Sequence, residues 1–338
     1  MTVNAHTLSN RLELTPPDTR IMESARQNIY DHVMSLQLDF LPVMKEKLQP
    51  LQRALSHAEA LWGEHLAAIV AQLRSVNLAP IDLKQQQIEA HPDLSDLQKQ
   101  LAIRMLNVER TRQLTGLTAI ILKAANAIAE SSDRMQQINL KLDGSRVQST
   151  LHKHVDRLTQ RKTDLDIRMS VIAEDRRLLD ETIKAYEKYN LADIFKDLLP
   201  SAEELALINV PSPEIALLQA GIARLGKLLG KISDAINYSE LTGERDKLRQ
   251  RYNTLLDDSR ANTQEIKATL FKLEELTLLS QVEQSKEAWV QEVRHVYRSL
   301  YRFLDKSAQQ NDSTVSASEH VAQLKTYLKS FHDINRTL

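Results

Sequence analysis

Proline is missing from two long stretches of this 338-residue chain, 93–199 and 214–338. Proline removes a backbone donor and its ring clashes with the preceding turn, so its absence leaves only a few glycines to interrupt a helix there. The whole chain has seven Gly, nine Pro and 4% aromatic residues, too few for a turn-rich or sheet-rich protein. A helix of about 50 residues is about 75 Å long. We therefore expect an all-α fold, an elongated bundle of long antiparallel coiled-coil-like helices with an apolar helical-hairpin tip.

Two apolar seams predict the stem of this hairpin. The first seam contains Leu151, Val155, Leu158, Leu165, Met169, Ile172, Leu179, Ile183 and Tyr186, with Lys162 and Arg176 as polar exceptions. The second contains Leu248, Tyr252, Leu255, Ile266 and Leu273, with Ser259, Asn262 and Thr269 at its polar positions. Spacing by threes and fours is typical of coiled coils. We expect 151–190 and 237–280 to pair as antiparallel stem helices.

The segment between the stem helices, 191–236, is the predicted tip. Its first part, 191–199, has the spacing of an amphipathic helix that Pro200 ends, and Ser212 is placed to cap a second helix. The second helix carries an apolar stripe formed by Ile215, Leu218, Ile222, Leu225, Leu229, Ile232 and Ile236. Its opposite face is small and cationic, with Ala216, Ala220, Ala223, Arg224, Lys227 and Lys231. This combination is typical of helices that lie on or line a membrane, whereas packing on its own protein explains most amphipathic helices.

The membrane interpretation assigns roles to particular residues of the tip. The candidates for membrane contact are Phe195, Leu198, Leu199, Leu205, Leu207, Ile208, Val210, Ile215, Leu218, Ile222, Leu225, Leu229 and Ile232. Uncompensated charge in hydrocarbon costs several kcal/mol, so the cationic face would turn to water. The candidates for a pore-facing position are therefore Arg224, Lys227 and Lys231. A second apolar run, 117–129, is too short to span a bilayer of about 30 Å, and we expect it to be a buried bundle segment, with lipid contact as the alternative.

The rest of the chain is expected to complete a single elongated helical-bundle domain over 15–338. A first helix opens after Thr15-Pro16-Pro17-Asp18 and is kinked or split by Pro42 and Pro50. Asp93 is a plausible cap for a long helix over 94–142. The other expected segments are a disordered N-terminus at 1–14, a connector or short helix at 81–92, a turn at 143–145 and a polar loop at 307–318.

The sequence carries no pattern typical of catalysis. It has no cysteine, and its ten histidines do not form a metal-binding motif. A glycine-rich phosphate loop and a nucleophile elbow are also absent. Gly221, Gly226 and Gly230 lie inside the helical repeat, which favours close helix contact. We expect no catalytic, cofactor-binding or metal-binding residues, and therefore no enzyme.

The net charge and the first residues of the chain bear on which partners it binds and in which cellular compartment it acts. The net charge is −1, which provides no basic field for nucleic acid. Met1–His6 has neither the basic nor the apolar region of a secretory signal, and no 18-residue apolar window is present. We expect a protein that is made soluble and, if it is secreted, leaves the cell without a cleavable signal peptide.

With its stem helices over 151–199 and 214–278 and its tip from Asp193-Ile194-Phe195 through Lys231-Ile232, the chain resembles the α-pore-forming toxins of the cytolysin A type. More narrowly, it resembles the B component of the binary xenorhabdolysin toxins. The tip is less continuously apolar than a cytolysin A tongue. The resemblance implies that a second all-helical component, A, engages the target-cell membrane and recruits this chain. It also implies a hetero-oligomeric ring whose pore the B hairpin helps to line.

A different class of protein has the same seams. A non-toxic coiled-coil scaffold, or a secretion-associated adaptor, would use them to bind partner helices. In that case the tip is only another packed corner of the bundle. Helical periodicity is the same in both cases, so the sequence leaves both functions open.

Overall fold

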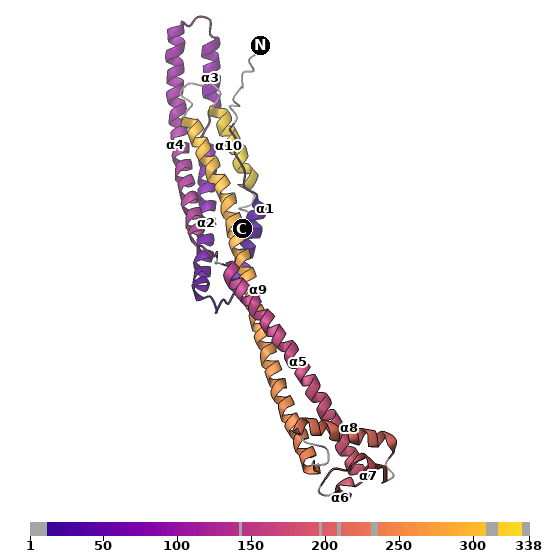
Figure 1. The fold of residues 1–338 in the computed structure, drawn as a ribbon. Coiled ribbons are helices and arrows are strands. Elements are labelled where there is room, and N and C mark those ends of the chain that lie inside the picture. Colours follow the sequence, from indigo (N-terminus) through magenta and orange to yellow (C-terminus); the bar gives the residue numbers. More distant parts are fainter. Residues whose placement is uncertain are drawn as a thin grey trace, which may run out of the picture. The chain divides into compact units, whose positions relative to one another are not determined.

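The computed structural model describes residues 12–141, 144–195, 198–207, 211–230, 236–308 and 317–332. These residues form helices, turns and loops and contain no strand, so the all-α prediction is confirmed. The helices, shown in Figure 1, are α1 (Thr19–Ser35), α2 (Pro42–Ser75), α3 (Ala79–Ala90), α4 (Asp96–Gln137), α5 (Gly144–Lys188), α6 (Leu191–Ile194), α7 (Ala202–Leu207), α8 (Ser212–Leu229), α9 (Tyr238–Ala308) and α10 (Ala317–His332).

The chain divides into two compact units. The first unit comprises Met1–Gly144 and Glu274–Leu338, and the second comprises Ser145–Leu273. Helix α9 therefore contributes residues to both units. The predicted tip and most of the predicted stem fall inside the second unit. The expectation of a single domain over 15–338 stays a prediction.

The first unit is organised around an apolar core to which α1, α2, α4, α10 and the later part of α9 contribute. The apolar run of α4 lies in this core, because Leu117, Ile121 and Ile128 are buried there. In this structure 117–129 is thus a buried bundle segment. Leu122, on the other side of α4, is exposed.

One stretch of the first unit, spanning α2 and α3, is long and apolar enough to cross a membrane by length and composition. The stretch Pro42–Ala90 meets the length and hydropathy test for a membrane span, although the sequence alone suggested none. Core helices of soluble proteins pass the same test. Leu51, Leu55 and Ile69 of α2 are fully buried in the core of the first unit, and 28% of the apolar window is buried in all.

The predicted first helix is split between α1 and α2. Pro42 begins α2 and Pro50 lies inside it, so only the first of these two prolines marks a break. Leu38, in the connection, has a φ of 48° and a fully buried side chain. This left-handed backbone costs an L-residue roughly 1–2 kcal/mol. Glu275 of α9 holds it in place, because its Oε1 accepts the N–H groups of Gln37 and Leu38 at 2.7 and 2.9 Å.

A second carboxylate of α9 holds the segment that follows α4. The Leu140 N–H donates to Oε2 of Glu283 at 3.2 Å, and the Lys286 Nζ donates to the Ile138 carbonyl at 2.7 Å. Glu283 and Lys286 are both buried and form an ion pair at 2.8 Å. Each buried charge thus has a charged partner and a backbone partner, which offsets the cost of removing it from water.

Several predicted boundaries shift in the structure. The described part of the N-terminus is packed, because Leu12 is buried and its N–H donates to Gln323, so the expected disorder does not extend to 12–14. Helix α3 occupies most of the predicted connector at 81–92. Helix α4 is capped by a Ser95–Gln98 capping box and not by Asp93. At 307–318, α9 continues to Ala308 and α10 begins at Ala317, while 309–316 and 1–11 lie outside the described residues.

In the second unit, α5 and the first part of α9 run side by side in opposite directions (Figure 1). Four contacts show the antiparallel direction, because later residues of α5 meet earlier residues of α9. They join His154 to Glu265, Leu158 to Asn262, Arg176 to Tyr252, and Glu187 to Tyr238. All residues of both predicted seams are buried or half-buried. The polar seam residue Asn262 is buried and donates from Nδ2 to the Leu158 carbonyl at 2.9 Å.

Candidate membrane-contacting tip

Helices α6, α7 and α8 gather at the end of the α5–α9 pair in the second unit (Figure 1). The prediction of one helix over 191–199 is wrong, because α6 ends at Ile194. Asn190, with a φ of 49°, separates α6 from α5. Beyond α6, the Leu199 N–H donates to the Ile236 carbonyl at 2.8 Å, so this backbone bonds across the tip and does not continue a helix.

Helix α8 is shorter than the predicted apolar stripe. It ends where Gly230 adopts a φ of 65°, the left-handed conformation that glycine supplies at a helix C-terminus. Gly230 is therefore a helix terminator and not a contact residue. The predicted cap is also wrong, since Pro211 precedes the helix and Ser212 is its first residue, with no side-chain cap bond.

The apolar stripe of α8 faces the second unit and not the solvent. Leu218, Ile222 and Leu225 are buried in one cluster with Leu179 and Ile183 of α5. The small face on the other side, Ala216, Ala220, Ala223 and Lys227, is exposed. The orientation expected from the pattern holds for these residues but not for Arg224, which was assigned to the same face and instead turns toward Asp175 of α5. In this conformation the apolar side packs on its own protein.

Two contacts hold α8 on α5, and we call them together the α8 clasp. The first is a close approach at Gly221, where an added Cβ would lie 1.8 Å from Oγ1 of Thr182. The second is a two-bond ion pair in which Nε and Nη2 of Arg224 donate to Oδ1 and Oδ2 of Asp175, each at 2.6 Å. Asp175 is only 8% exposed, whereas the Arg224 side chain is 35% exposed, so the pair is partly shielded from water, and its two charge-assisted bonds make it stronger than a single-bond surface pair. The close contact predicted for Gly221 is confirmed.

The structure distributes the other candidate residues over three environments. Leu199, Leu205, Leu218, Ile222 and Leu225 are buried, whereas Phe195, Ile215 and Leu229 are half-buried. Leu198 and Leu207 are exposed, and Leu207 is 86% exposed. The candidates Ile208, Val210, Lys231 and Ile232 lie outside the described residues. Of the cationic candidates, Arg224 is held by Asp175 and Lys227 is exposed.

The sequence analysis missed the α5 half of the clasp. Asp175 and Thr182 are seven residues apart, which places them on one face of α5 two turns from each other. The stem seam of α5 has the same seven-residue spacing, with Lys162 and Arg176 at its polar positions. A polar pair at that spacing, opposite a glycine and an arginine three residues apart on α8, is the signal that the sequence contained.

Two stacked tyrosines lie under the tip. The rings of Tyr186 and Tyr238 are 5.1 Å apart, and the Tyr238 hydroxyl donates to Glu187. Burial raises the pKa of Tyr186 to about 12, and the nearby Tyr238 adds to this. The Tyr186 hydroxyl has no hydrogen-bond partner within the part of the chain that the structure describes. In the same part, no group of three or more His, Cys, Asp or Glu side chains is placed to hold a metal ion.

Comparison with known proteins finds neither a matching family model nor a matching curated protein. Solved structures do match. PaxB from Photorhabdus luminescens aligns with a TM-score of 0.82 at 16% identity, covering 95% of this chain and 96% of PaxB. The chain shares the PaxB fold. XaxB from Xenorhabdus nematophila gives a TM-score of 0.71 at 16% identity, covering 96% of this chain and 100% of XaxB.

The PaxB fold is also present in an assembled pore. A chain of the YaxAB pore complex matches with a TM-score of 0.67 at 20% identity, over 95% of this chain and 99% of that one. At these identities the likeness establishes the fold.

Proposed function

We propose that this chain is one subunit of a binary α-pore-forming toxin, equivalent to the B component that its sequence resembles. It assembles with a second all-helical component into a hetero-oligomeric ring on a target-cell membrane. The observation that carries the proposal is the fold that the chain shares, over 95% of its length, with a chain of the YaxAB pore complex. In this proposal the chain is a secreted protein that acts at the target-cell membrane, and it has no enzymatic activity.

The buried stripe supports a mechanism in which α8 leaves α5. In the structure described here, Leu218, Ile222 and Leu225 are buried and unavailable to lipid, so membrane contact requires the α8 clasp to open. The apolar side chains that lose their contacts when α8 leaves α5 would be buried again in the hydrocarbon of the membrane. This burial limits the net free-energy cost of moving α8 from protein to lipid. Leu207 is already 86% exposed and is the residue we propose as the first lipid contact.

A cross-link between α8 and α5 tests this mechanism. The chain has no cysteine, so Asp175→Cys with Arg224→Cys can be joined by a reducible bis-maleimide linker. We expect the linked protein, mixed with the proposed second helical component, to bind liposomes without releasing a trapped dye, and to release it after the linker is reduced. Equal leakage before and after reduction would show that α8 does not move. No leakage from the unmodified pair of proteins would instead support the scaffold or adaptor function.

Leu207 provides a second test with a matched control. Leu207→Asp should leave the melting temperature within about 1 °C, because an exposed side chain contributes little to the fold, and should reduce leakage at least tenfold. Met105→Asp is the control, since Met105 is a 75% exposed apolar residue of α4 in the first unit. If both variants reduce leakage equally, the loss of leakage comes from adding a charge anywhere on the surface and not from the place of Leu207 in the tip.

We propose that the cationic face of α8 lines the pore. Once Arg224 separates from Asp175 its charge must face water, and with Lys227 and Lys231 it would place positive charge along the lumen, which biases ion selectivity. Lys227→Glu with Lys231→Glu leaves the clasp intact. In planar bilayers we expect leakage to persist and the reversal potential to shift toward cation selectivity. Unchanged selectivity in active channels would exclude this face from the lumen, and lost membrane binding would assign the lysines to lipid head groups.

A further inference from the structure

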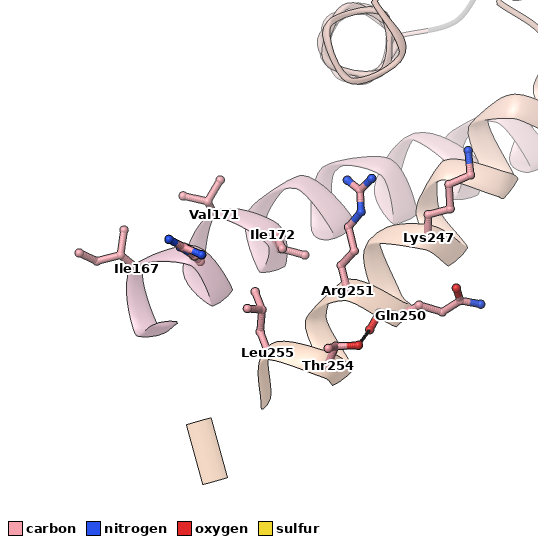
Figure 2. Close-up of a pocket in the computed structure, with 9 residues that line it drawn as sticks. Ile167, Val171, Ile172, Lys247, Gln250, Arg251, Thr254 and Leu255 are labelled. Carbon is pink, nitrogen blue, oxygen red and sulfur yellow. Dashed lines mark hydrogen bonds between the residues drawn. The ribbon is translucent and has the colours of Figure 1, made fainter. Parts of the chain in front are cut away.

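The stem of the second unit carries a groove between α5 and α9 with a volume of about 720 Å³. We call it the stem groove, and it is lined by Ile167, Arg168, Val171, Ile172, Lys247, Gln250, Arg251, Thr254 and Leu255. Figure 2 shows these side chains coming from two neighbouring helices, with the apolar ones mostly on α5 and the polar ones on α9. Ile167 and Val171 are 59% and 52% exposed, so apolar surface is left open to solvent beside the seam that α5 and α9 already share.

The shape of the stem groove fits a helix. Its apolar residues on α5, Ile167 and Val171, are four residues apart, and Lys247, Arg251 and Leu255 repeat the same spacing on α9. Residues four apart lie above one another on one helix face. The two rows therefore run parallel to the helix axes, the α5 row over about 6 Å and the α9 row over about 12 Å, given a rise of about 1.5 Å per residue. A two-helix stem with such rows offers the holes into which the knobs of a third helix pack.

The charge of the stem groove selects what kind of helix fits. Its lining includes three cations, Arg168, Lys247 and Arg251, and no carboxylate. Arg168 and Lys247 pair with Asp164 and Glu244 on their own helices, and Arg251 forms no ion pair among the described residues. The Arg168–Asp164 pair is exposed and contributes little to stability, so Arg168 and Arg251 are available to a partner. The Lys247 side chain is 61% exposed although its partner Glu244 is buried, so its remaining donors face the solvent. A partner helix with carboxylates beside its apolar edge is complementary to this rim.

We propose that the stem groove binds an amphipathic helix of another protein chain, with an apolar edge flanked by Asp or Glu. Ile167, Val171, Ile172 and Leu255 would contact the apolar edge, while Arg168, Lys247 and Arg251 would pair with the flanking carboxylates. Burial of this apolar row supplies affinity, and the cations supply selectivity and orientation. The inference goes beyond the proposed function and does not depend on it, because it concerns a surface outside the tip.

The test uses the full-length protein with a single reporter in the groove. Thr254→Cys introduces the only cysteine, which carries an environment-sensitive dye. The probes are three designed helical peptides of about 24 residues, long enough to be helical in isolation. They share one leucine seam and differ only in flanking Glu, Gln or Lys. We expect the Glu-flanked peptide to bind at least about tenfold more tightly than the Lys-flanked one, because up to three charge pairs change sign.

Matched variants decide whether the binding is in the groove. Val171→Asp should abolish binding of the Glu-flanked peptide, and Arg251→Glu should remove most of the preference for Glu over Lys. Arg249→Glu is the control, because Arg249 is an exposed residue of α9 that does not line the groove, and it should leave both affinities unchanged. All three variants change exposed side chains, and circular dichroism melting confirms that each is folded.

Four outcomes would overturn the proposal. Equal binding of the three peptides would reduce the groove to a non-selective apolar patch, and no dye response to any peptide would exclude helix binding. A dye response to vesicles containing phosphatidylserine, with none to the peptides, would assign the groove to lipid. A concentration-dependent dye response without any peptide, lost in Val171→Asp and accompanied by dimer in sedimentation, would assign it to a second copy of this chain.

Discussion

Helices α4 and α8 both bury an apolar face, but different contacts hold them. The face of α4 that includes Leu117 and Ile121 lies in a core to which several helices of the first unit contribute apolar side chains. The buried face of α8 packs in the smaller cluster of the second unit and is fixed by the Gly221–Thr182 approach and the Asp175–Arg224 pair. The comparison teaches that a similar apolar pattern packs into a core of several helices in one place and, in the second unit, is held by a few specific contacts, which is where our proposal expects α8 to detach.

The largest expected effect comes from placing a charge in the core into which α4 packs. Ile121→Asp buries an unpaired carboxylate where Ile121 is fully buried, and we expect it to destabilise the protein by more than about 4 kcal/mol. Trp62 and Trp289 both belong to the first unit and are the only tryptophans, so urea unfolding followed by tryptophan fluorescence reports this loss. The control Leu122→Asp changes an exposed neighbour and should shift stability by less than about 0.5 kcal/mol. Similar unfolding of both variants would mean that α4 is not anchored through this face.

The α8 side of the comparison is tested by filling the space at Gly221. Gly221→Val places a side chain against Thr182, where even a Cβ would be 1.8 Å from its hydroxyl oxygen. We expect a local cost of about 2 kcal/mol, seen as at least tenfold faster hydrogen exchange of α8 amides with unchanged tryptophan fluorescence. Gly243→Ala is the matched control, because an added Cβ there meets no atom within 4 Å, and it should stabilise α9 by about 0.5–1 kcal/mol. If α8 exchange is unchanged in Gly221→Val, the clasp does not hold this helix.

The smallest expected effect concerns Tyr186, below the clasp. At pH 7, Tyr186→Phe should leave stability within about 0.5 kcal/mol, because the hydroxyl has no partner among the described residues. Burial raises the pKa of Tyr186 to about 12 in the folded state, against about 10 in the unfolded chain. The folded state then holds the proton more tightly, so stability falls as the pH rises above 10. At pH 11 we expect the variant to be about 1 kcal/mol more stable than the parent by urea unfolding. Equal losses in both proteins between pH 7 and pH 11 would contradict this.

The sequence predicted those features that depend on local spacing. The α5 and α9 seams are correct down to the polar residue Asn262, because a repeat of three and four residues determines which face of a helix is buried. The inward stripe and outward small face of α8 follow from the same rule. Residues four apart on one helix lie on one face regardless of where the rest of the chain packs.

The features that the sequence did not predict depend on distant residues. Helix α6 ends early because the Leu199 N–H bonds to the Ile236 carbonyl across the tip, a partner that helical periodicity cannot reveal. Asp175 pairs with Arg224, 49 residues away, only because α8 docks at a particular position on α5. Tertiary packing determines helix ends and polar contacts of this kind, whereas the spacing along one helix determines which apolar residues share a face.

The α8 clasp has a mechanical consequence. Van der Waals contact between Gly221 and Thr182 loses much of its attraction within about 1 Å of separation, and the two bonds of the Asp175–Arg224 pair, each 2.6 Å long, require the planar groups to stay in register. Both interactions therefore fail over a very short displacement. Once both are broken, only the burial of Leu218, Ile222 and Leu225 against α5 still opposes separation of the two helices, and that resistance declines gradually with the apolar area exposed.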